Sequence, residues 1–118
     1  MSETTLYDVR GRATAYIADD GETIYTWRGR AVAYLENDKV YSWRGRHFGW
    51  FVDGVMFDGR GRRCGYVAGR SPVAVSASPA KSAKSARPAK SARSAARARP
   101  ALSLGRSDIP LDEFLVRS

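Results

Sequence analysis

The chain has 118 residues, of which 20 are basic and 12 acidic, giving a formal net charge of +8 at pH 7. This length fits one domain, and the single cysteine excludes both an intramolecular disulfide framework and a cysteine-based zinc site. No apolar run approaches the ~18–20 residues of a membrane-spanning helix. The first residues, Met-Ser-Glu-Thr-Thr, do not read as a secretory signal. We therefore expect a cytoplasmic protein.

The charge is unevenly distributed along the chain. Residues 1–70 carry 11 basic and 9 acidic groups, whereas residues 71–107 carry eight basic groups and no acid. Residues 108–118 have a net charge of −2. This partition predicts a nearly neutral folded domain over 1–70, a basic tail over 71–106 and a short terminal motif over 107–118.

Four copies of one motif fill the first segment. They read LYDVRGR at 6–12, IYTWRGR at 24–30, VYSWRGR at 40–46 and MFDGRGR at 56–62. Aromatic and β-branched flanks favour strands. A short polar residue followed three positions later by glycine favours a three-residue hairpin loop with a glycine bulge. Each copy therefore predicts a β-hairpin whose turn depends on one glycine, and the four turn glycines are Gly11, Gly29, Gly45 and Gly61.

The strand after each turn has one position that is always small, occupied by Ala15, Ala33, Gly49 and Gly65. A small residue at the same place in every copy indicates close approach around a central axis. We predict an all-β fold of four sequential hairpins in a pseudo-fourfold arrangement, followed by a disordered basic tail. The alternative is a flat eight-stranded meander, which would expose two sheet edges and a broad apolar face.

The motif Tyr-Asp-x-x-Gly-Arg-x-x-Ala-Tyr-Ile, repeated four times over about residues 5–70, resembles the four-fold beta flower domain family. The resemblance implies four short hairpins arranged as petals about a pseudo-fourfold axis, and it implies no activity. The Arg-Gly-Arg tips, together with Arg63 and Cys64 in the last copy, depart from the family pattern. On this resemblance the tail lies outside the domain.

Each hairpin tip places two arginines beside its glycine. Arginine forks suit phosphate and carboxylate oxygens, so the tips are candidate contacts for a polyanion, and they would form one basic ring if all four pointed the same way. Trp27 and Trp43 lie next to two tips, where they either stack on bases or pack within the fold. The alternative for the arginines is that exposed loops simply carry solvated charge. The candidate tip residues are Arg10, Arg12, Arg28, Arg30, Arg44, Arg46, Arg60 and Arg62.

The tail consists almost entirely of Ser, Ala, Pro, Lys and Arg. It lacks the large apolar groups that would offset the entropy of ordering, so we expect it to be disordered. Such a tail either neutralises nucleic-acid phosphates without sequence preference or serves as a spacer that its charge keeps extended. The candidate polyanion-binding residues of the tail are Lys81, Lys84, Arg87, Lys90, Arg93, Arg97 and Arg99.

The terminal motif predicts a short amphipathic helix after Pro110, with Leu111, Phe114 and Leu115 on one face. Two turns of helix are not stable alone. We expect the motif to dock either onto its own head or onto a protein partner, and the remaining alternative is a frayed terminus without a function.

No arrangement of residues indicates catalysis, a cofactor or a metal. His47 follows a tip and is expected to be an exposed loop-edge residue, while Cys64 is expected to be a small packing residue. The sequence thus favours a non-enzymatic binding or adaptor module whose tail contacts nucleic acid or another polyanion. The alternatives are a small-ligand or carbohydrate-binding module built on the aromatic hairpins, and a purely structural or protein-interaction domain. The oligomeric state stays open.

Overall fold

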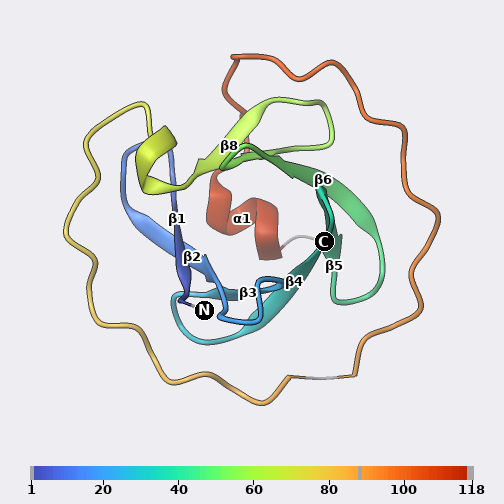
Figure 1. Ribbon diagram of the computed structural model, residues 1–118, viewed down its shortest axis with the longest axis horizontal. Coiled ribbons are helices and arrows are strands. Elements are labelled where there is room, and N and C mark those ends of the chain that lie inside the picture. Colours follow the sequence, from blue (N-terminus) through green and yellow to red (C-terminus); the bar gives the residue numbers. More distant parts are fainter. Residues whose placement is uncertain (1, 88, 117–118) are drawn as a thin grey trace.

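The computed structural model describes residues 2–87 and 89–116, and residues 4–66 form a closed antiparallel barrel of eight strands (Figure 1). A 3-10 helix, η1 (Ala68–Arg70), follows the barrel, and an α-helix, α1 (Leu111–Val116), follows the tail. The strands are β1 (Thr4–Tyr7), β2 (Ala13–Ile17), β3 (Thr23–Thr26), β4 (Ala31–Glu36), β5 (Lys39–Ser42), β6 (His47–Val52), β7 (Val55–Phe57) and β8 (Arg63–Tyr66).

Closure of the barrel comes from the pairing of its first and last strands. Each strand pairs with the next along the chain, and Tyr7 of β1 pairs with Tyr66 of β8. A closed sheet has no free edge from which another chain could extend it. The predicted all-β arrangement of four hairpins about an axis is therefore confirmed, and the flat meander is excluded.

The four tips have the predicted turn. In the first, the Gly11 amide donates to the Asp8 carbonyl at 3.0 Å, and the Asp8 amide donates to the Arg12 carbonyl at 3.0 Å. The carboxylate of Asp8 also accepts from the amide of Arg10 at 2.9 Å. The four turn glycines have φ between 79° and 89°, where a side chain would be strained. Each tip is thus a type I turn closed by a glycine bulge.

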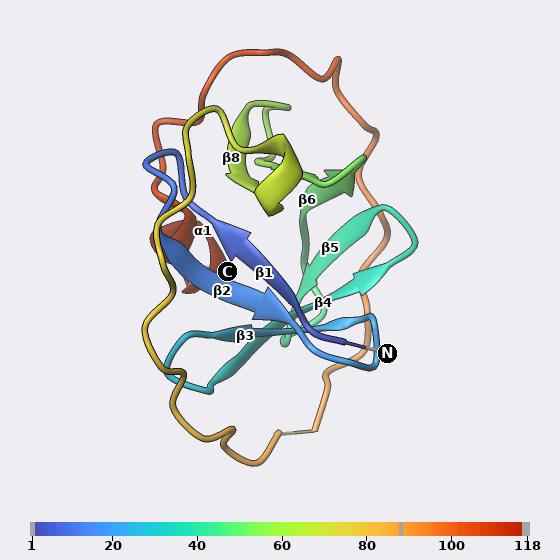
Figure 2. The same cartoon turned by 60° about the vertical axis from the view of Figure 1, so that its left-hand side comes forward.

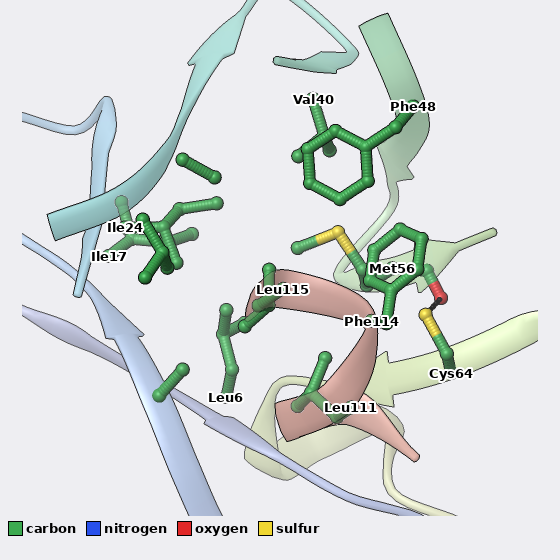
Figure 3. Packing of buried hydrophobic residues seen from close by; sticks show 13 residues of the cluster. Leu6, Ile17, Ile24, Val40, Phe48, Met56, Cys64, Leu111, Phe114 and Leu115 are labelled. Carbon is green, nitrogen blue, oxygen red and sulfur yellow. Dashed lines mark hydrogen bonds between the residues drawn. The ribbon is translucent and has the colours of Figure 1, made fainter. Parts of the chain in front are cut away.

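Helix α1 lies on the barrel axis, at the centre of the ring of hairpins in Figure 1. Its residues Leu111, Phe114 and Leu115 are buried and join the main apolar cluster with strand residues such as Leu6 and Met56 (Figure 3). A six-residue helix is not stable in isolation, so its stability comes from this packing. Of the two docking alternatives, the structure shows the first: the motif occupies its own barrel.

The helix also explains the small position in the hairpins. A Cβ added to Gly49 would lie 2.7 Å from Cζ of Phe114, and one added to Gly65 would lie 2.8 Å from Cδ1 of Leu111. The predicted close approach is therefore between the strands and the helix, and at Gly49 also between neighbouring hairpins, since its Cβ would lie 2.6 Å from the carbonyl oxygen of Phe57 in β7.

Residues 71–87 and 89–106 form an extended segment, called the belt below, that encircles the barrel before the chain turns inward to α1 (Figure 1). The segment remains outside the strands when the molecule is turned by 60° (Figure 2). In its described part it holds no helix or strand, and its one bridge joins Arg106 to Arg63. The disorder predicted for this segment remains a prediction, which hydrogen exchange can test.

Candidate functional site

The belt contacts the four tips at regular intervals. The amide of Ser85 donates to the carbonyl of Gly29, and the amide of Ser94 donates to that of Gly45, both at 2.8 Å. The same bond joins Ser76 to Gly11 at 2.8 Å and Ser103 to Gly61 at 2.9 Å. The four serines are nine residues apart, so one nonapeptide of belt spans each hairpin. Our sequence reasoning missed this period, although the recurring Ser-Ala pairs at 76, 85 and 94 carried it.

Close contact at the tips gives their glycines a second role. A Cβ on Gly29 would lie 2.1 Å from the carbonyl oxygen of Ala83, and one on Gly45 would lie 2.1 Å from that of Ala92. A side chain at either glycine would therefore push the belt away from the barrel, in addition to straining the turn.

Lysines of the belt lie over the aromatic side chains of the hairpins. Lys81 Nζ is 4.1 Å from the ring centre of Tyr16 and 5.5 Å from that of Trp27. Nine residues later, Lys90 Nζ is 4.3 Å from Tyr34 and 5.4 Å from Trp43. Each tryptophan meets its tyrosine edge-on, with ring centres 5.9 and 5.8 Å apart. The aromatic hairpins thus form cation cages, and the cations in them belong to the protein itself.

Tail cations also pair with the acidic turns of the barrel. Glu3 accepts from both Lys81 and Lys84, and these hydrogen bonds lower its pKa. Six of the seven candidate tail residues have an acidic partner in the barrel, and the exception among the residues that the structure describes is Arg97. The remaining pairs are Arg87–Asp20 (3.2 Å), Lys90–Glu22 (3.4 Å), Arg93–Glu36 (2.8 Å) and Arg99–Asp38 (3.1 Å).

Asp20 is held firmly in its charged form. Burial opposes ionisation, but hydrogen bonds from the hydroxyl of Thr23 (2.6 Å) and from the amides of Thr23 and Glu22 (2.8 Å each) outweigh it. Together with nearby Arg87 they lower the pKa of Asp20 to about 2. The carboxylate that anchors the belt here therefore stays charged at any physiological pH.

The arginines of the tips are in a different situation. All eight are exposed, and two of them have an acidic partner in the described part of the chain: Arg12 with Asp8 at 3.2 Å, and Arg62 with Asp108 at 3.7 Å. The tips lie at four separate places around the barrel in Figure 1, and do not form one compact cluster. Within the described residues, the tip arginines without an acidic partner are Arg10, Arg28, Arg30, Arg44, Arg46 and Arg60.

His47 is not the exposed loop-edge residue that the sequence predicts: that prediction was wrong. The side chain is 1% exposed, with its ring edge-on to Trp50 at 4.7 Å. Its Nε2 bonds the Gly49 carbonyl at 2.9 Å, and its Nδ1 accepts from the amide of Arg97 at 2.8 Å. Burial lowers the pKa of His47. The belt, 50 residues further along the chain, supplies one of these partners, the amide of Arg97, and the flanking sequence gave no sign of that contact.

Cys64 is buried among the apolar residues of the barrel interior, as expected of a packing residue. Its Sγ donates to the Met56 carbonyl at 3.4 Å, and burial raises the pKa of the thiol well above its ordinary value. Over residues 2–87 and 89–116, no group of three or more His, Cys, Asp or Glu side chains is arranged to hold a metal ion. The helices in that part of the chain are too short or too polar to cross a membrane.

Comparison with known proteins identifies a family for the whole arrangement. The family model described as "4-fold beta flower protein" matches residues 4–115. Neither the curated proteins nor the solved structures gave a match. The family match extends beyond the four repeats to the belt and α1, so the expectation that the tail lies outside the domain was wrong. Four hairpins, a belt in register with them and an axial helix form one unit, and the chain belongs to the 4-fold beta flower protein family.

Proposed function

We propose that this protein is a non-enzymatic binding module that contacts nucleic acid through the arginine tips of its hairpins. The supporting observation is the contrast between its two sets of cations. Six tail cations are paired with barrel carboxylates, whereas six tip arginines are exposed without an acidic partner among the described residues. A polyanion binds most favourably to cations that are not already paired, because no existing ion pair has to be broken first.

Binding of this kind is independent of sequence and sensitive to salt. Each phosphate that is neutralised releases condensed counterions, so the logarithm of affinity falls with the logarithm of salt concentration by about 0.9 per contact on duplex DNA. The number of arginines engaged can therefore be read from the slope.

The binding test requires the full chain. A fragment of residues 1–70 would separate head from tail, but it would also remove Leu111, Phe114 and Leu115 from the interior of the barrel. Loss of binding in that fragment would then report loss of the fold. Substitutions that preserve the chain length avoid this problem.

Two full-length variants of equal net charge distinguish binding by the tips from binding by the tail. The tip variant carries Arg10→Gln, Arg28→Gln, Arg30→Gln and Arg44→Gln, and the tail variant carries Lys84→Gln, Arg87→Gln, Arg93→Gln and Arg99→Gln. Fluorescence anisotropy with an arbitrary labelled duplex, over a salt series, should show a shallower salt slope for the tip variant, by up to about 3.6 if all four arginines engage. The tail variant should keep the slope of the parent protein.

The reverse result would contradict the tips as the contact surface. If the tail variant lost the slope and the tip variant kept it, the tail would be the binding element and would have to leave the barrel. If the parent protein bound no duplex even at low salt, the nucleic-acid function would be excluded.

A further inference from the structure

One of the four hairpins lacks a side chain that others have. Two residues before the tip glycine, the repeats carry Val9, Trp27, Trp43 and Gly59. Both tryptophans pack edge-on against a tyrosine of the preceding hairpin. Gly59 has no side chain at that place in the fourth hairpin, and the guanidinium of Arg97 lies beside it. The atoms nearest to a Cβ there would be Nη1 of Arg97 at 3.2 Å, the Phe48 carbonyl oxygen at 3.7 Å and Cζ of Arg97 at 3.9 Å.

A cavity of about 680 Å³ opens at this position, between the third and fourth tips. A smaller hollow of about 510 Å³ lies between the second and third tips, with Trp43 in its wall. The two cavities occupy equivalent places in successive repeats. Arg30 and Arg44 line the smaller cavity, and the residues at the same repeat positions, Arg46 and Arg60, line the larger one. The larger volume lies within the range of small-molecule sites, roughly 300–1,000 Å³.

The charge of the wall favours an anion. Four arginines line it, against two carboxylates: Arg46, Arg60, Arg62 and Arg97 against Asp58 and Asp108. Both carboxylates are already engaged. Asp58 accepts from the amides of Arg60 and Arg62, at 2.9 and 3.0 Å, and from the hydroxyl of Ser107 at 2.5 Å. Asp108 pairs with Arg62 at 3.7 Å. Within the described residues, three guanidinium groups are left without an acidic partner.

The rest of the wall is apolar. Phe48 and Phe114 pack with ring centres 4.8 Å apart (Figure 3), and with Ile109 they line the cavity. Phe48 is 7% and Phe114 5% exposed, so a small part of each ring is open to a ligand, and an aromatic ring would cover that part whereas inorganic phosphate would not. A wall that combines arginine forks with aromatic side chains suits a ligand with an oxyanion at one end and a ring at the other.

We propose that the cavity between the third and fourth hairpins binds a small aromatic oxyanion, meaning a phosphate or carboxylate carried on a ring. Arg46, Arg60 and Arg97 bind the oxyanion, and Phe48 and Phe114 contact the ring. The site needs the belt in place, because Arg97 belongs to the belt and its amide is fixed by His47 at 2.8 Å.

Isothermal titration calorimetry on the full chain tests this with three probes: phenyl phosphate, inorganic phosphate and benzyl alcohol. We expect phenyl phosphate to bind at least ten-fold more tightly than either of the others. Phenylacetate, tested in parallel, distinguishes the carboxylate from the phosphate. Equal affinity for phenyl phosphate and inorganic phosphate would overturn the proposal, since it would reduce the site to surface charge.

Substitutions in the cavity wall test whether phenyl phosphate binds at this site. Gly59→Trp restores the side chain found in the second and third hairpins and displaces Arg97, so it should weaken phenyl phosphate binding at least ten-fold. Arg46→Gln and Arg97→Gln should each weaken it by a similar factor, and both side chains lie at the surface, so they decide the matter if Gly59→Trp does not fold. The matched control Arg28→Gln lies at another tip and should leave the affinity unchanged. Unchanged affinity in both Arg46→Gln and Arg97→Gln would refute the site.

This outcome is independent of nucleic-acid binding. The four arginines replaced in the tip variant lie outside the cavity wall, so that variant should retain phenyl phosphate binding. Loss of phenyl phosphate binding in it would mean that the probe binds the tips in general, which would also refute the cavity as its site.

Discussion

The amide of Ser85 donates a hydrogen bond to the carbonyl of Gly29 at 2.8 Å, and the same bond recurs nine residues later between Ser94 and Gly45. The nine-residue repeat of the belt is thereby matched to the longer hairpin repeat of the barrel. Nine residues of extended belt cover the arc that one hairpin repeat of 16 to 18 residues occupies. Every tip glycine accepts one backbone hydrogen bond from the belt, and the second and third tips accept another at the carbonyls of Trp27 and Trp43.

Hydrogen exchange should reveal this period. The amides of Ser76, Ser85, Ser94 and Ser103 are expected to exchange more slowly than neighbouring belt amides that have no carbonyl partner, because an amide exchanges only when its bond opens. Two-dimensional NMR after transfer to deuterated buffer measures this directly. Uniformly fast exchange over residues 76–103 would instead support the disordered tail that the composition predicts.

Truncation of Phe114 should destabilise the barrel strongly. Its ring is 5% exposed and packs in the interior cluster, so Phe114→Ala leaves a cavity and is expected to lower the free energy of unfolding by about 3–5 kcal/mol. Urea denaturation measures the change. Val116→Ala on the same helix is the control, because Val116 is 49% exposed and its loss should change stability by no more than about 0.5 kcal/mol. Equal effects from the two variants would show that the helix does not fill the barrel.

A methyl group at Gly49 should also be costly. Its Cβ would lie 2.6 Å from the Phe57 carbonyl oxygen and 2.7 Å from the Phe114 ring, and backbone cannot yield as a side-chain end can. We expect Gly49→Ala to lower the free energy of unfolding by about 1–3 kcal/mol. Gly69→Ala is the matched control, since nothing lies within 4 Å of its added Cβ. A neutral result at Gly49 would mean that β6 and α1 are further apart than described.

His47 should make stability depend on pH. Burial lowers its pKa in the folded protein below the ordinary 6.5. The unfolded chain therefore takes up a proton first as the pH falls, and stability decreases below about pH 7 until the folded state is protonated as well. Protonation of Nδ1 also removes the acceptor for the amide of Arg97. His47→Ala introduces the residue that the first two repeats carry at the equivalent position, Ala13 and Ala31. The thermal unfolding of this variant and that of the parent protein should differ in pH dependence between pH 7.5 and 5.5. Parallel curves would contradict a buried neutral imidazole.

The hairpins were predictable because each turn is encoded locally. An Asp, Thr or Ser followed three residues later by glycine specifies the bulged turn at all four tips, and the alternating strands specify the flanks. Closure through Tyr7 and Tyr66 was less accessible, because it joins residues 59 positions apart by a single pair. The amphipathic face of Leu111, Phe114 and Leu115 was visible in the sequence, but its location was not, since apolar spacing shows which face is buried and not what covers it.

The two sets of cations also differ in how much the sequence predicted of their surroundings. The tip arginines were found from the repeat, whereas the partners of the tail cations were not, because Lys90 and Glu22 lie 68 residues apart. Composition alone treats a lysine beside solvent and a lysine over Tyr34 as equal. The cavity beside Gly59 was also missed, although the sequence signal was present: one repeat has glycine where two others have tryptophan.

The position of α1 also bears on how the protein is made. All eight strands leave the ribosome before the residues that fill the space between them have been synthesised. A nascent chain that has reached residue 100 carries four hairpins around an unfilled interior, with Leu6 and Met56 still lacking their partners from the helix. Completion of the core is therefore a late event that joins residues about a hundred positions apart, which is slow in terms of contact order. A chain terminated early presents that open interior to chaperones and proteases. Because Leu111, Phe114 and Leu115 pack in the core, we expect a chain that ends before them to lack a stable barrel.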